Sequence, residues 1–373
     1  MALNTFFQNF NINKTFSQFK KNKSFLGIDL GSSSLKVVQL KKERERPILE
    51  TYGELSLAKY GVDGQTGRSV RIIGDKMAEA LKDLIKESQV TAKEATVSIP
   101  IKESFLTTIE MPNLSETELK EAVPFEARKY IPIPMSEVEI DWWVLPPQSK
   151  EMKVASPGSG KKKFLNIILA AVPKEVISKY RSILKDAGIE VSAFEIEVFA
   201  FARASIKEDF GSILLMDIGA ATTKISIADG GVIRSSHGFD HGGQELTLAL
   251  SQSMGIDFER AEILKRQAGL LKKPENEGVA SILETLFEYS SSEGERFLID
   301  WKRKGGRAIS RVLIGGGGAL LPGAKDALIK SYGVEVDMIN PFYKVVYPPF
   351  LEPALKEIGP SFVNAVGLAL REF

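Results

Sequence analysis

The chain has 373 residues, of which 43% are hydrophobic and 26% are charged, and its formal net charge is +1. This length predicts two or more domains, and the hydrophobic content is sufficient for sizeable cores. The near-neutral charge excludes a generally basic nucleic-acid-binding protein, the lack of cysteine excludes disulfides and thiolate metal sites, and no apolar run is long enough for a membrane-spanning helix.

Residues 1–24 differ from the rest of the chain. They combine phenylalanine and leucine side chains at roughly helical spacing with four lysines and no acidic residue. A basic amphipathic segment of this kind can lie on an anionic membrane surface. A disordered tail, or a helix that docks on a protein surface, is the simpler prediction.

The stretch 25–38, FLGIDLGSSSLKVV, predicts an apolar strand, a tight turn of small residues and a second strand. Asp29 stands just before the turn, where an acidic residue is not expected in a core. A strand at 48–57, an amphipathic helix at 69–88 and a strand at 95–100 are predicted to follow. This order is typical of one half of an α/β domain.

Residues 103–189 are predicted to form an insert with the order strand, helix, strand, strand, helix. Its first helix begins with a capping box at 115–118. A polar loop rich in Lys, Ser, Gly and Pro, at 146–163, separates the second strand from the third. The chain is predicted to return to the first half at 190–206.

The pattern of the first hairpin returns at 214–227, LLMDIGAATTKISI. Both copies contain D-[LI]-G-[SA]-[SA]-[ST]-x-K, and a repeat of this kind suggests two similar α/β halves that face each other. The matched pairs are Asp29 and Asp217, Gly31 and Gly219, Ser34 and Thr222, and Lys36 and Lys224.

The two turns predict a site for phosphate groups. Each turn would present backbone amides and hydroxyls to phosphate oxygens. Each aspartate could hold Mg²⁺ and its waters between the phosphates and the protein. Two ordinary hairpins are the alternative, but the matching acid, glycine, hydroxyl and lysine favour a binding function.

Helices are predicted at 242–255, 257–268 and 276–304, followed by a strand at 307–314. This strand leads into Gly315–Gly318. Four consecutive glycines are costly to order unless something must approach the backbone closely. We expect a flat ring to rest on this backbone, with a flexible turn as the alternative.

Together these motifs resemble the actin-like ATPase superfamily, and within it the PilM family of the type IV pilus assembly platform. The resemblance extends over 25–373 and depends on GIDLGSSSLKVV, MDIGAATTKISI, GGQELT and IGGGGALLPG. It implies an α/β, actin-like ATPase fold of two duplicated halves, in which a 1C insert, shared with FtsA, replaces subdomain 1B of actin. The implied parts are a leader at 1–24, subdomain 1A at 25–102, 190–210 and 340–373, subdomain 1C at 103–189, subdomain 2A at 211–241 and 307–339, and subdomain 2B at 242–306.

The resemblance also implies ATP and Mg²⁺ as cofactors. It places the metal at Asp29 and Asp217. Glu197 matches the position that orients or activates water, and the nearby Glu195 leaves this assignment open. The residues assigned to the nucleotide are Gly31, Ser32, Ser33, Ser34 and Lys36 in the first phosphate motif, Gly219, Ala220, Thr222 and Thr223 in the second, Gly242 and Gly243 at the start of GGQELT, Glu262 and Lys265 beside ribose and adenine, and Gly315, Gly316, Gly317, Gly318 and Leu320 in the adenosine motif.

The function that the resemblance implies is that of an ATP-binding protein in the cytoplasm, peripheral to the inner membrane. Its expected partner is the N-terminal cytoplasmic peptide of a PilN-like inner-membrane protein, bound in a nucleotide-dependent way, with other platform components as further partners. Hydrolysis is expected to be slow or absent. The alternatives are an FtsA-like filament-forming protein and a small-molecule kinase of the same fold, although no convincing acceptor base is found for a kinase.

Overall fold

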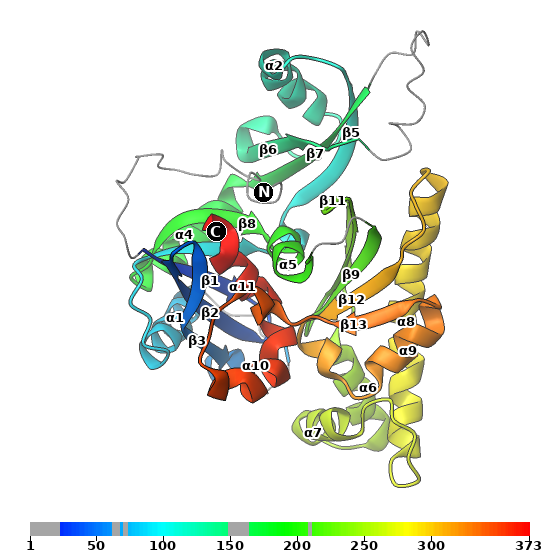
Figure 1. The fold of residues 1–373 in the computed structure, drawn as a ribbon. Helices are drawn as coiled ribbons and strands as arrows, with labels where there is room; N and C mark the ends of the chain where they lie inside the picture. The colour runs from blue at the N-terminus through cyan, green and yellow to red at the C-terminus, as the bar shows by residue number, and fades with distance from the viewer. Residues whose placement is uncertain (1–22, 62–67, 70–73, 148–163, 208–210) are drawn as a thin grey trace.

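The computed structural model describes residues 23–61, 68–69, 74–147, 164–207 and 211–373 (Figure 1). The predictions for the leader and for most of the 146–163 loop therefore lie outside the described residues. Within the described part of the chain, no helix is long and apolar enough to cross a membrane.

Two five-stranded sheets form the body of the molecule. The strands of the first are β1 (Ser24–Leu30), β2 (Ser34–Glu43), β3 (Arg46–Ser56), β4 (Glu94–Ile99) and β8 (Glu190–Ile196). The strands of the second are β9 (Ser212–Ile218), β10 (Thr223–Asp229), β11 (Val232–Phe239), β12 (Arg311–Gly315) and β13 (Glu335–Met338).

Both sheets have the same topology. Their strand orders are β3-β2-β1-β4-β8 and β11-β10-β9-β12-β13. In each, three strands form an antiparallel meander and the last two strands run parallel to the first strand of that meander. The predicted duplication of an α/β half is therefore present in the backbone, and each predicted phosphate turn joins the first two strands of its half.

The helices of the first half share one hydrophobic core with its sheet. They are α1 (Gly74–Glu87), α4 (Lys174–Asp186), α5 (Glu197–Ser205), α10 (Glu352–Ile358) and α11 (Val363–Ala369). Helix α11 packs closely on β1 and α5. The glycines make this possible, since a Cβ at Gly27 would overlap the backbone of Ala365 and a Cβ at Gly367 would overlap the backbone of Ala200. This packing fixes the positions of β1 and α5, which carry the predicted site residues Asp29 and Glu197.

The second half has its own core, formed by β9, β10, β12 and the helices on that side of the molecule (Figure 1). These helices are α6 (Gly243–Met254), α7 (Phe258–Ala268), α8 (Glu277–Arg303) and α9 (Ala324–Tyr332). Helix α8 spans 27 residues and packs against α6, α7 and α9.

The insert forms a third sheet, which stands above the two halves in Figure 1. Its elements are β5 (Phe105–Pro112), α2 (Glu116–Ala127), β6 (Val138–Val144) and β7 (Phe164–Pro173), with the strand order β5-β7-β6. They enclose a separate small core. Helix α4 follows β7 in the chain, as predicted, but packs against α1, and its buried side chains belong to the first core.

Candidate functional site

The two predicted phosphate turns present the same residue types from equivalent positions. Across the first hairpin Asp29 pairs with Lys36, and across the second Asp217 pairs with Lys224. Residues directly opposite each other on an antiparallel pair project from the same face of the sheet. Each half therefore brings one acidic and one basic side chain together beside its turn.

In the first half, Lys36 turns toward the outer strand. Its Nζ donates a 2.7 Å hydrogen bond to Ser34 Oγ and lies 3.0 Å from Glu54 Oε1. Burial raises the pKa of Glu54, but Lys36 and the Ser34 hydroxyl outweigh burial and hold that pKa below its usual value. The positive charge of Lys36 is thus balanced by the carboxylate of Glu54 on β3.

In the second half, Lys224 turns inward. Its Nζ lies 3.0 Å from Glu197 Oε2 and 3.3 Å from Asp217 Oδ2. Burial lowers the pKa of Lys224, but the two carboxylates outweigh burial and raise the pKa above its usual value. The carboxylates thus favour the charged form of Lys224.

The outer strand of each half explains this difference. Glu54 of β3 is paired with Lys36, whereas Gly238 of β11 is paired with Lys224. Since a glycine offers no side-chain acceptor, β11 supplies no carboxylate opposite Lys224, and the ammonium group contacts Asp217 and Glu197 instead. The two hairpins repeat in their backbones but differ in the charge that they place at the site.

Asp29 lies at the end of β1 and is partly exposed. Its Oδ1 accepts a 3.0 Å hydrogen bond from Ser98 Oγ, and the same hydroxyl oxygen accepts a hydrogen bond from the backbone N–H of Leu30. Desolvation raises the pKa of Asp29, and the attraction of Lys36 and Lys224 opposes this rise. The Ser98 hydroxyl therefore fixes the orientation of this carboxylate.

The acids Glu195 and Glu197 occupy different places. Glu195 forms a buried ion pair with Arg203, away from the turns. Glu197 is the first residue of α5, and besides Lys224 it binds the backbone N–H of Ile101, whose nitrogen lies 2.9 Å from its Oε1. Desolvation raises the pKa of Glu197 despite the nearby ammonium group. The structure thus places Glu197, and not Glu195, in contact with Lys224 beside the second predicted phosphate turn.

Three of the four glycines at 315–318 are required by the protein's own packing. A Cβ at Gly315, Gly316 or Gly318 would press against or overlap a neighbouring group. Gly316 also has a φ of 83°, a conformation that favours glycine. The neighbours concerned are Phe201 at Gly315, Asp217 and Ile218 at Gly316, and Ile218 at Gly318.

Gly317 differs from the other three. A Cβ added at Gly317 would have no heavy atom within 4 Å, and the residue is exposed. Leu320, at the end of the same short helix (Gly317–Leu320), is 40% exposed. Gly317 and Leu320 are therefore the parts of the predicted adenosine motif that face solvent and are accessible to a ligand.

Gly242 and Gly243 hold the start of α6 against the second predicted phosphate turn. The backbone N–H of Gly243 donates to Gly219 O and that of Gln244 donates to Ala220 O, both over 2.9 Å. A Cβ at Gly242 would overlap the backbone of Ala220. A helix N-terminus beside a turn of small residues is a favourable environment for anions.

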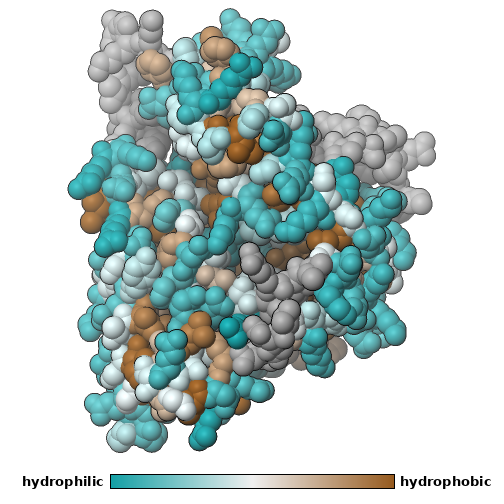
Figure 2. Space-filling model, turned by 180° about the vertical axis from the view of Figure 1, so that it is seen from behind, coloured by the Kyte–Doolittle hydropathy of each residue, from teal (hydrophilic) through white to brown (hydrophobic). Residues whose placement is uncertain are grey.

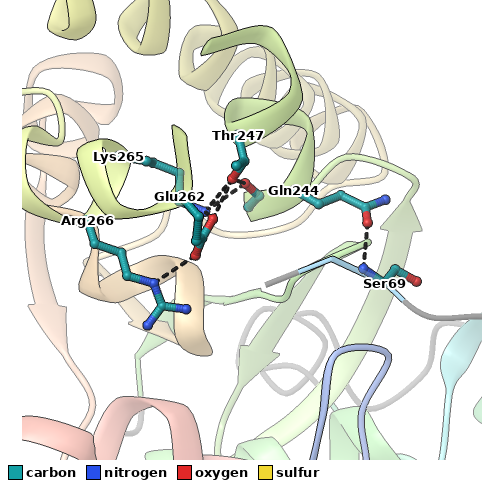
Figure 3. Close-up of polar contacts among 7 residues, drawn as sticks. Ser69, Gln244, Thr247, Glu262, Lys265 and Arg266 are labelled. Carbon is teal, nitrogen blue, oxygen red and sulfur yellow. Dashed lines mark hydrogen bonds and ion pairs between the residues drawn. The ribbon is translucent and has the colours of Figure 1, made fainter. Parts of the chain in front are cut away.

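Glu262 and Lys265 form a buried polar cluster with Thr247, which Figure 3 shows between α6 and α7. Lys265 Nζ donates to Glu262 Oε2 at 2.6 Å, to Thr247 Oγ1 at 2.9 Å and to Gly243 O at 2.9 Å. Arg266 Nε donates to the other oxygen of Glu262 at 2.7 Å. Burial raises the pKa of Glu262, but these donors outweigh it and lower that pKa. The cluster joins α6 to α7 beside the second turn.

The remaining predicted nucleotide residues lie at the two turns, and one of them, Thr223, is buried in the protein. Thr223 is fully buried, and its hydroxyl donates to His241 O at 2.6 Å. Ser32 is exposed. The partly exposed residues of the two turns are Gly31, Ser33, Ser34, Gly219, Ala220 and Thr222.

Two contacts join the first half to the helices of the second. The backbone N–H of Ser69 donates a 2.8 Å hydrogen bond to Gln244 Oε1 (Figure 3). The guanidinium of Arg68 lies 5.9 Å from the centre of the Phe258 ring. These contacts bridge the two halves close to the predicted nucleotide residues of α6.

Two residues of the site were missed as site residues by sequence reasoning. Lys224 had been matched to Lys36 but was given no role. Asn364 donates a 3.1 Å hydrogen bond from Nδ2 to Asp217 Oδ2, while its buried Oδ1 has no partner among the residues that the structure describes. The repeat could have identified Lys224, whereas no local pattern marks Asn364.

The acids fit a magnesium ion only in part. Among the described residues, no group of three or more His, Cys, Asp and Glu side chains could hold a metal ion. Mg²⁺ bound with a nucleotide usually takes one or two carboxylates, with waters and phosphates as its other ligands. Asp29 and Asp217 could supply these carboxylates, but Asp217 Oδ2 already contacts Lys224 and Asn364.

A hollow of about 270 Å³ lies between the insert and β11. Its lining includes Phe105, Tyr130 and Leu169 of the insert, His237 of β11, and Ile101 at the junction with the first half. Tyr130 is 46% exposed at its edge. On the face shown in Figure 2, apolar residues form separate patches within a mainly hydrophilic surface.

The chain matches one family and several solved structures. The model of the family described as "Type IV pilus assembly protein PilM" matches residues 27–373. A structure described as "PilM-PilN type IV pilus biogenesis complex" is 25% identical over 93% of this chain and 98% of that chain, with a TM-score of 0.77.

Two less similar structures share the fold. The ethanolamine utilization protein EutJ from Carboxydothermus hydrogenoformans is 17% identical over 97% of this chain and 94% of its own, with a TM-score of 0.54. MreB5 of Spiroplasma citri bound to ADP is 15% identical over 93% of this chain and 95% of its own, with a TM-score of 0.51. These similarities confirm the predicted actin-like fold.

Proposed function

This chain belongs to the PilM family of type IV pilus assembly proteins, and we propose that it is an ATP-binding, actin-like component of the pilus platform. Its proposed partner is the N-terminal peptide of a PilN-like inner-membrane protein, through which it would associate with the membrane and other platform components. The similarity to the PilM-PilN complex over nearly the whole chain supports this partner.

We propose that the nucleotide lies between the two phosphate turns. In this proposal the partly exposed turns at Gly31 and Gly219, the start of α6 and the exposed Gly317 would contact the nucleotide from both halves, with Glu262 and Lys265 beside it on α7. Asp29 and Asp217 are the proposed contacts of a nucleotide-bound Mg²⁺, through its waters. The proposed subdomain boundaries are those implied by the sequence, except that α4, which lies within 103–189, packs with the first half.

The two contacts of Glu197 are the observation that supports nucleotide-dependent binding of the partner peptide. One of its oxygens binds Lys224 beside the second turn, and the other binds the backbone N–H of Ile101, where the insert begins. A shift of the turn on nucleotide binding would thus act on the insert through one side chain. Because both oxygens already have partners, Glu197 is poorly placed to accept a proton from water, and we expect slow hydrolysis.

The hollow beside the insert is the proposed seat of the partner peptide. Its lining combines apolar and aromatic side chains with polar ones such as Ser104, Thr107 and Ser236, and it includes Ile101, which the Glu197 contact connects to the proposed nucleotide site. Peptides bind through side-chain pockets and backbone contacts of this kind. A ligand can shift a conformational equilibrium only by its different affinity for the two states, so nucleotide and peptide should alter each other's affinity by the same factor.

A calorimetric titration tests this function. The protein is titrated with the N-terminal cytoplasmic peptide of the PilN-like protein from the same organism, with and without Mg-ATP. We expect binding whose Kd changes on addition of the nucleotide. Tyr130→Ala should weaken peptide binding, whereas Phe350→Ala, which removes an aromatic ring that is 79% exposed outside the hollow, should not. An absence of binding in both nucleotide states would contradict the proposed function.

A further inference from the structure

We propose that Lys224 acts as a built-in counter-ion for the nucleotide phosphates, so that nucleotide binding by this chain needs little divalent cation. This inference rests on the proposed function, because it concerns the same nucleotide site. It assigns to a side chain part of the charge neutralisation that a metal ion would otherwise supply.

The first step is the position of the ammonium group. Lys224 Nζ contacts Asp217 and Glu197, and it lies 3.5 Å from the point that a Cβ on Gly219 would occupy. Gly219 belongs to the second phosphate turn. The charge of Lys224 is therefore located among the acids and directly beside the turn, where a cation that joins phosphate to protein would be needed.

The second step is the reason that this lysine is there. Lys36, its counterpart in the first half, is paired with Glu54 on the neighbouring strand. Lys224 faces Gly238 at the equivalent position. Lys36 is thus held by an ion pair with the outer strand, although its charge still acts on Asp29, whereas Lys224 is in direct contact with Asp217 and Glu197.

The third step is the balance of charge. Without Lys224, the carboxylates of Asp29, Asp217 and Glu197 would repel the phosphates of an incoming nucleotide. A lysine ammonium has three donor hydrogens, and within the described part of the chain two of them are directed to Asp217 and Glu197. The third is available for a phosphate oxygen.

The first experiment uses the full chain and a chelator. ATP is titrated into the protein by calorimetry in Mg²⁺ and, separately, in EDTA without divalent cations. We expect the Kd for ATP to rise by less than about tenfold in EDTA, which corresponds to less than about 1.4 kcal/mol of binding free energy. A larger loss would overturn the inference, and because ATP would still bind in Mg²⁺, the proposed function would stand. A folded protein that binds ATP in neither buffer would contradict both.

The second experiment changes the lysine. Lys224→Met should make the Kd in EDTA at least about tenfold weaker than the Kd in Mg²⁺, while Lys224→Arg should resemble the unmodified chain. Lys102→Met is the matched control, since Lys102 is an exposed lysine paired with Asp240 outside the site. An equal EDTA-to-Mg²⁺ ratio in Lys224→Met and the unmodified chain would overturn the inference.

A further variant tests the inference if Lys224→Met fails to fold. Lys224→Met leaves two buried carboxylates without their cation, which can destabilise the fold. The double variant Lys224→Met/Glu197→Gln removes one charge of each sign and keeps an acceptor for the backbone N–H of Ile101. It should show the same dependence on Mg²⁺ as Lys224→Met, and ATP binding that is unaffected by EDTA in the double variant would overturn the inference.

Discussion

In the glycine-rich loop at 315–318, three glycines pack against neighbouring residues and Gly317 faces solvent. Gly318 lies against the Ile218 side chain, so closely that a Cβ would overlap it. Gly317, one residue earlier, faces open space. Because the two glycines are adjacent in the chain, they allow packing to be separated from ligand binding.

This contrast gives a prediction for stability and binding. Gly318→Ala should lower the free energy of unfolding by about 1–3 kcal/mol, the usual cost of overpacking a close contact. Gly317→Ala should leave stability nearly unchanged but weaken ATP binding, because its methyl group would occupy the surface on which we expect adenosine to rest. Urea unfolding and ATP calorimetry measure the two effects. Equal ATP affinity in Gly317→Ala and the unmodified chain would argue against this part of the site.

Among the elements, the buried side chain of Arg203 joins α5 to β8 by an ion pair and to α11 by a hydrogen bond. Arg203 of α5 donates to both oxygens of Glu195 at the end of β8, and to Gly367 O of α11 over 2.8 Å. Glu197 begins α5 and Asn364 lies in α11, so the orientation of these helices sets the position of two residues that surround Asp217 and Lys224.

Removal of one member of this pair should be costly. Arg203→Met would leave the buried carboxylate of Glu195 without a partner, and we expect a loss of about 3–5 kcal/mol in the free energy of unfolding. Glu195→Leu/Arg203→Met should lose less, because no unpaired charge remains. Chemical unfolding of both variants tests this. A double variant that is less stable than Arg203→Met would show that the ion pair is not the reason for the loss.

At the scale of the whole molecule, Glu197 connects three parts of the structure. Its contacts reach Lys224 in the second half and Ile101 at the start of the insert, while its own helix belongs to the first half. The contact of Ser69 with Gln244 links the two halves on the other side of the phosphate turns. A change in the angle between the halves would therefore be transmitted to the insert through the contacts of Glu197 with Lys224 and Ile101.

The coupling between nucleotide and peptide should depend on this side chain. Glu197→Ala removes both contacts and should reduce the factor by which ATP changes peptide affinity to about one, without abolishing peptide binding. Glu197→Gln keeps an acceptor for Ile101 and should retain part of the coupling. Peptide titrations with and without Mg-ATP give the factor for each variant. An unchanged factor in Glu197→Ala would exclude this route.

The duplicated fold and the positions of the two matching turns could be predicted from the amino-acid sequence alone. Strands, turns and amphipathic helices are set by local periodicity and by glycine, so both hairpins and the insert could be predicted from residue patterns. The positions of Asp29 and Asp217 followed from the same repeat. Their roles toward a metal remain predictions.

The pairing of the charged side chains could not be predicted from the sequence and is seen only in the three-dimensional structure. Lys36 and Lys224 are equivalent in the sequence repeat, but their partners depend on a third strand that carries Glu54 in one half and Gly238 in the other. Glu195 and Glu197 are likewise distinguished by their positions on either side of the junction between β8 and α5. A side-chain contact depends on the distance between elements far apart in the chain, and local patterns do not contain that distance.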